Sequence, residues 1–79
     1  MALDNNKLKR CLFQINRSGI NSRAGELLLD SVSNTGKLML RKYLEDNVTG
    51  MPVWDSERQV PEKIIAAVKE ILQEYQVQI

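Results

Sequence analysis

The chain of 79 residues is long enough for one domain and too short for two, and its net charge of +1 creates no strong field toward nucleic acid or membranes. It contains no histidine and a single cysteine, Cys11. This composition excludes an intrachain disulfide, a Ser–His–Asp or Cys–His catalytic arrangement, and a structural zinc site of the usual Cys/His kind. We therefore expect one small domain over residues 1–79 that uses neither a metal nor another cofactor.

The location of the protein is predicted from its apolar runs and from its cysteine content. No uninterrupted apolar stretch approaches the roughly 20 residues that cross a membrane, and residues 1–7 lack the pattern of a signal peptide. A lone unpaired cysteine suits a reducing compartment. We therefore predict a cytoplasmic protein without a membrane partner.

The two ends of the chain show the clearest helical patterns. Between residues 4 and 17, apolar side chains recur at helical spacing, with Asp4 placed to cap the first amides: Leu8, Cys11, Leu12 and Ile15. Between residues 61 and 77, Pro61 fits the first helical turn and is followed by a second stripe: Ile64, Ile65, Val68, Ile71, Leu72 and Tyr75. A helix is predicted over each segment.

The middle of the chain gives two further helices. Residues 21–32 carry a helical stripe behind a capping Asn21 or Ser22, and residues 36–48 are rich in helix formers. Residues 51–60 read as a loop that carries Trp54, the only tryptophan. The sequence therefore predicts an all-α fold, a small four-helix domain.

An alternative fold is α+β, with a hairpin at residues 25–44 between the two terminal helices. Residues 33–36 have turn chemistry, and Leu38, Leu40 and Leu44 follow part of a period-two pattern. Strand formers are scarce in this segment, since only Val32 and Tyr43 are good ones. Helices are the preferred prediction.

Charge is unevenly distributed along the chain. Residues 1–23 hold five cations against Asp4 alone, whereas residues 49–79 hold three cations against five carboxylates. The simplest interpretation is ordinary solvated helix faces. The alternative is a surface near the N-terminus that binds anions or an acidic partner.

The preferred functional prediction is protein binding. More apolar residues are present than four helical stripes require: Phe13, Leu29, Leu38, Met39, Met51, Trp54, Val77 and Ile79. In so small a domain some of them must lie near the surface, where an apolar patch marks an interface. We expect a small non-catalytic regulator, adaptor or inhibitor that associates with itself and binds a protein through Phe13, Met39, Met51, Trp54 and Ile79. Trp54 has a competing interpretation as a plug over the core.

The alternative function is DNA binding of the helix-turn-helix kind, with the turn at residues 33–36. Side chains suited to phosphates and base edges are Arg17, Arg23, Thr35, Lys37, Arg41 and Lys42. Against it, Leu38 and Met39 stand where base contacts would lie, and Glu45 and Asp46 would repel the DNA backbone.

Catalysis is not expected. Glu45 and Asp46 are adjacent on a predicted helix and face different directions, and Asp55 and Glu57 lie in a loop. Neither pair has the apolar setting that separates two pKa values for acid–base work. Cys11 falls within the apolar stripe of the first helix, which predicts a buried structural thiol.

Overall fold

The structure, a computed structural model, describes residues 4–50 and 52–76. Its elements are helices α1 (Asn5–Ser18), α2 (Arg23–Asp30), α3 (Asn34–Leu44) and α4 (Glu62–Glu74), with a π-helical turn η1 (Glu45–Thr49) and a 3₁₀ turn η2 (Glu57–Gln59). The described residues form no strand, and their one β-bridge joins Val32 to Gln76. The four-helix prediction is confirmed, and the hairpin alternative is wrong.

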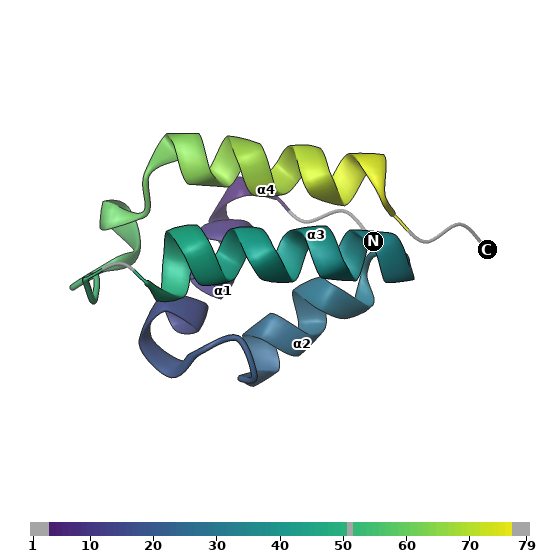
Figure 1. Ribbon diagram of the computed structural model, residues 1–79. Coiled ribbons are helices and arrows are strands. Elements are labelled where there is room, and N and C mark those ends of the chain that lie inside the picture. Colours follow the sequence, from purple (N-terminus) through teal and green to yellow (C-terminus); the bar gives the residue numbers. More distant parts are fainter. Residues whose placement is uncertain (1–3, 51, 77–79) are drawn as a thin grey trace.

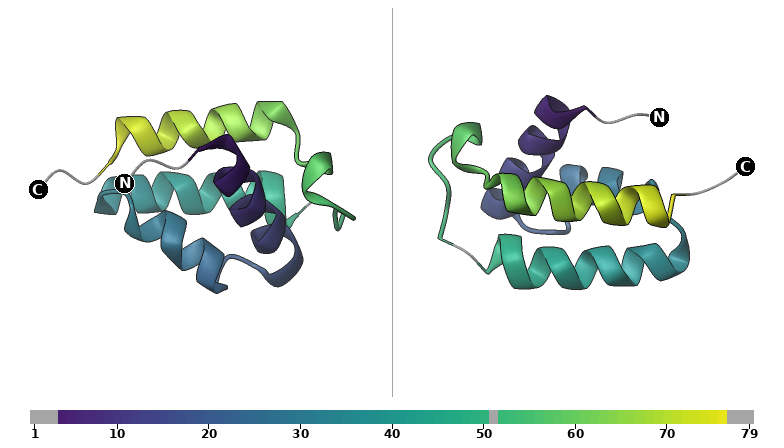
Figure 2. Two further views of the ribbon diagram at one scale, coloured as in Figure 1. Left: turned by 180° about the vertical axis from the view of Figure 1, so that it is seen from behind. Right: turned by 90° about the horizontal axis from the view of Figure 1, so that it is seen from above.

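The helices form two layers. Helices α3 and α4 run antiparallel side by side and form one layer (Figures 1 and 2). Helices α1 and α2 pack against one side of that pair and form the other layer. The start of α3 is joined to the end of α4, because the Ser33 amide donates a 2.7 Å hydrogen bond to the Tyr75 carbonyl. Gly36 lies against Tyr75, so that a Cβ at Gly36 would stand 2.5 Å from the Tyr75 Cβ. One outer face of the molecule is therefore built from α3 and α4 together.

Side-chain caps fix where the first three helices begin. Asp4 accepts a 2.8 Å hydrogen bond from the Lys7 amide, as predicted, and Ser22 caps α2. The hydroxyl of Ser33 accepts from the Gly36 amide at 3.3 Å, so α3 begins at Asn34 instead of Gly36. The predicted turn at residues 33–36 is thus a cap and a first helical turn, because a serine at this position satisfies an otherwise unpaired amide.

The ends of the later helices also differ from the prediction. The α-helical geometry of α3 stops at Leu44, and the chain continues to Thr49 as a π-helical turn. Pro61 stands at the N-cap of α4 and not within its first turn. Helix α4 ends at Glu74, while the last residue of the predicted segment, Val77, lies outside the described residues.

The core lies between the two layers and contains the predicted stripes. Leu8, Leu12 and Ile15 of α1 are fully buried. They pack in one cluster with apolar residues of every other helix, among them Leu28, Val32, Leu40, Leu44, Ile65 and Val68. Trp54 belongs to this cluster and keeps only 7% of its surface exposed. The interpretation of Trp54 as a plug over the core is correct.

A buried amide holds the segment after α3 against α1. The Asn16 Nδ2 group donates to the carbonyls of Val48 at 2.9 Å and Pro52 at 3.3 Å, and its Oδ1 atom accepts from the Trp54 amide at 2.8 Å. Asn16 is the only buried polar residue among those described, and all of its hydrogen bonds go to backbone groups of this segment. Asn16 therefore supplies hydrogen-bond partners to backbone groups of this segment.

Candidate protein-binding surface

The basic N-terminal helix is paired within the chain. Arg10 of α1 lies 3.3 Å from Glu57, and the Lys9 ammonium lies 3.7 Å from Glu62. These two contacts join α1 to the acidic C-terminal part of the sequence. Two of the N-terminal cations therefore form ion pairs with carboxylates of the C-terminal part of the same chain.

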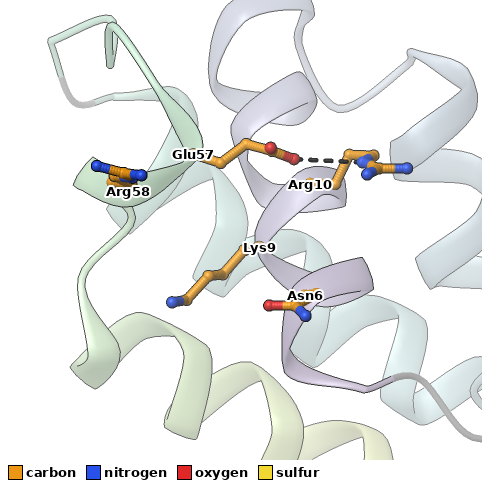
Figure 3. Close-up of a pocket in the computed structure, with 5 residues that line it drawn as sticks. All are labelled: Asn6, Lys9, Arg10, Glu57 and Arg58. Atoms are coloured by element: carbon orange, nitrogen blue, oxygen red, sulfur yellow. Dashed lines mark hydrogen bonds and ion pairs between the residues drawn. The ribbon is translucent and has the colours of Figure 1, made fainter.

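The same region contains a hollow of about 290 Å³, lined by Asn6, Lys9, Arg10, Glu57 and Arg58. In Figure 3 the Glu57 carboxylate points toward Arg10, while Lys9 points away from that pair. The lining offers cations and an amide but no nucleophile and no histidine. It is an open, polar surface feature that is already partly neutralised by Glu57.

Groups for catalysis or metal binding are not assembled in the described part of the chain. No cluster of three or more Cys, Asp or Glu side chains could hold a metal ion there. Burial raises the pKa of the Cys11 thiol, and the nearby Arg10 charge opposes this only in part. A raised pKa keeps the thiol protonated and therefore a poor nucleophile. Within residues 4–50 and 52–76, no helix is both long and apolar enough to span a membrane.

The residues predicted for a protein interface differ in how far they are exposed. Trp54 is buried, which contradicts its use as an exposed anchor, because its ring fills the core beneath the loop. Phe13 is half-buried against the core, and the Arg17 guanidinium lies 5.5 Å from its ring centroid. Met39 is 50% exposed. Met51 and Ile79 lie outside the described residues.

The most exposed large apolar side chain among the described residues is Leu38, with 72% of its surface accessible. It lies on the outer side of α3, two residues from the fully buried Leu40. Thr35 and Lys42, at i−3 and i+4, are exposed on the same side. Leu38 thus lies among polar residues on a helix whose other leucines form the core.

Met39 shares a side of α3 with Gly36. It is three residues after Gly36, which contacts Tyr75, and four before the half-buried Tyr43. Residues at these spacings share one side of a helix. Tyr43 packs against the core, and this burial raises the pKa of its phenol. The apolar surface of α3 therefore extends from Leu38 toward the junction with α4.

Helix α4 has one small and three charged residues along one of its sides. Lys63, Glu70 and Glu74 are exposed, and Ala67 is half-buried. Their spacing of four, three and four residues places them along one side of the helix. We call the outer surface of the two helices the α3–α4 face, defined by Leu38, Met39, Lys42 and Asp46 together with Lys63, Ala67, Glu70 and Glu74.

The residues predicted to contact DNA do not form one group: two lie on α1 and α2, and four lie on α3. Arg17 donates a 3.1 Å hydrogen bond to the Trp54 carbonyl and so helps to hold the loop. Arg23 is exposed on α2, at a distance in sequence from the other cations. The remaining four lie on α3: Thr35, Arg41 and Lys42 are exposed, and Lys37 is half-buried.

Sequence reasoning missed the exposure of Leu38 and the acidic side of α4. Leu38 was one of several surplus apolar residues, and only its placement two residues before the buried Leu40 singles it out. The acidic side of α4 gave no signal, since exposed glutamates are ordinary on a helix. A comparison with known protein families, curated sequences and solved structures found no match to this chain.

Proposed function

We propose that this chain is a non-catalytic protein-binding domain, acting as a regulator, adaptor or inhibitor, and that the α3–α4 face is its contact surface. The observation that carries the proposal is the 72% exposure of Leu38, with the 50% exposed Met39 beside it. Adjacent apolar side chains on a helix surface are typical of interfaces. Methionine also suits a surface that adapts to its partner.

The charges around these residues favour a protein partner over DNA. Arg41 and Lys42 are exposed, which is the observation that keeps DNA binding as a second candidate. However, the exposed carboxylates of Glu45 and Asp46 follow them within one helical turn. A surface of alternating sign resembles the polar rim of a protein interface. Binding to DNA depends on cations that neutralise phosphates, and nearby carboxylates weaken that attraction.

A photo-crosslinking amino acid placed at position 38 tests this proposal in the native host. The matched control carries the same amino acid at position 53, because Val53 is also apolar and is 60% exposed, but lies in the loop after α3. We expect protein adducts from position 38 that are several times more abundant than those from position 53. Both variants should keep the helical circular dichroism of the unmodified chain.

The same experiment separates the two functions. Adducts between position 38 and nucleic acid would overturn the protein-binding proposal in favour of DNA binding. Equal adduct yields from positions 38 and 53 would also overturn it, because the α3–α4 face would then contact proteins no more often than an exposed loop does. Fluorescence anisotropy with a random DNA duplex adds an independent check, and we expect no salt-sensitive binding.

A further inference from the structure

We propose that the α3–α4 face binds a second copy of this chain, with α3 of each copy lying antiparallel on α4 of its partner about a two-fold axis that runs along the two helices. This inference rests on the proposed function and names its partner. It follows from the order of charges along the two helices and from their antiparallel arrangement (Figure 1).

The two helices present opposite charges at matching heights. Gly36 and Tyr75 are in contact, which sets the register of the antiparallel pair. Lys42 lies six residues after Gly36, and Glu70 lies five residues before Tyr75. Because an α-helix rises about 1.5 Å per residue, Lys42 and Glu70 stand within about one residue of the same height along the layer.

A second pair follows the same register. Asp46 lies ten residues after Gly36, and Lys63 lies twelve residues before Tyr75. From α3 into η1 the sign therefore changes from positive at Lys42 to negative at Asp46. Along α4 it changes from negative at Glu70 to positive at Lys63, in the same direction through space.

These charges have no ion-pair partner within the described part of the chain, where the salt bridges are Lys9–Glu62 and Arg10–Glu57. A two-fold axis parallel to the helices keeps every residue at its own height and exchanges α3 with α4. It thereby sets Lys42 of one copy opposite Glu70 of the other, and Asp46 opposite Lys63. An isologous contact of this kind satisfies both copies with one patch and closes at a dimer.

The apolar residues of the face lie where this arrangement needs them. Met39 shares a side of α3 with Gly36, which contacts Tyr75, and Ala67 is half-buried on α4, so we place both residues near the axis, where each would meet its counterpart. Leu38 lies farther out and packs on the partner's α4. Charged pairs would then surround an apolar centre, which is the usual anatomy of a protein interface.

The size of the face predicts a weak dimer. Helices of 11 and 13 residues are roughly 17 to 20 Å long, and two neighbouring helices cover a width of roughly 20 Å. The contact therefore covers roughly 300 to 400 Å² per copy, well below the roughly 800 Å² of a stable complex. We expect a dimer that forms and dissociates with concentration.

Sedimentation equilibrium of the full chain over a wide concentration range tests the proposal through a charge exchange. Lys42→Glu and Glu70→Lys should each weaken dimerisation by about tenfold or more, since each substitution places like charges together at both symmetry-related contacts. The double variant should recover most of the affinity. Arg23→Glu, an exposed charge reversal on α2, should leave dimerisation unchanged, and circular dichroism verifies that every variant folds.

The outcomes distinguish this inference from the proposed function. A monomer at every concentration, together with protein adducts from position 38, would overturn the second copy as partner and leave protein binding intact. A dimer in which the double variant is as weak as the single variants would overturn the α3-on-α4 arrangement. The absence of adducts from position 38 would overturn both proposals.

Discussion

Removing the Asn16 side chain should destabilise the fold strongly. Asn16→Ala removes two hydrogen bonds donated to the Val48 and Pro52 carbonyls and one accepted from the Trp54 amide. At about 1 kcal/mol for each of the three hydrogen bonds, the loss is about 3 kcal/mol, and any backbone group left buried without a partner adds to it. The melting temperature of a domain of this size should then fall by roughly 12 to 24 °C. Thermal and urea unfolding, followed by circular dichroism at 222 nm, measure the change.

A matched control is Asn47→Ala, because Asn47 donates one hydrogen bond to the Tyr43 carbonyl a turn earlier in the same helical segment. It should cost no more than about 1 kcal/mol. Trp54 fluorescence provides a second signal, since its emission should shift to longer wavelength in Asn16→Ala as water reaches the ring. A loss below about 1 kcal/mol for Asn16→Ala, or one equal to that of Asn47→Ala, would refute the role assigned to Asn16.

Four further predictions concern single side chains. Gly25→Ala should destabilise the fold, because the new Cβ would overlap the backbone carbonyl oxygen of Ile20. At an open position in a helix the same change stabilises by about 1 kcal/mol, so the sign of the change in unfolding free energy, measured with urea, tests the prediction. Cys11 should react slowly with iodoacetamide until the chain is denatured, because burial raises the pKa of its thiol. The raised pKa also means that the folded state favours the neutral thiol. The unfolding free energy of the native chain, measured against that of Cys11→Ala, should therefore be constant below about pH 9 and fall as the pH rises above it. Urea unfolding at a series of pH values measures this difference. Leu38→Ser should leave the unfolding free energy unchanged within about 0.5 kcal/mol, because the side chain is already mostly in water.

The helical fold could be predicted because its information is local. The stripe that includes Leu8 and Leu12 and the stripe that includes Ile64 and Ile65 each point to a single buried side, and those residues are buried in the structure. The start of α3 was misplaced because Ser33 favours both turns and helix caps, and only the bond to the Gly36 amide decides between them. Such a choice depends on the neighbouring α4, which holds the Ser33 amide through Tyr75.

The candidate site could be predicted only in part, because it depends on which surplus apolar residues find a place in the core. Trp54 entered the core since the Asn16 amide draws its backbone against α1, a contact across 38 positions that no local pattern contains. Met39 was correctly assigned to the surface, although its role there stays a prediction. Lys42 was predicted only as a DNA contact and Glu70 carried no signal, and the two stand at matching heights only because α3 and α4 are antiparallel.

Leu38 is not needed by the fold, and this is the strongest reason to assign it to binding. Its neighbours Leu40 and Leu44 complete the buried side of α3 without it. Full burial of a leucine side chain contributes about 1.5 to 3 kcal/mol, so covering the 72% now exposed would contribute about 1 to 2 kcal/mol. That amount is too small to hold two proteins together alone, given the entropy lost on association. Binding through Leu38 therefore requires additional contacts from the same surface, and the opposite charges of Lys42 and Glu70 are placed to supply them.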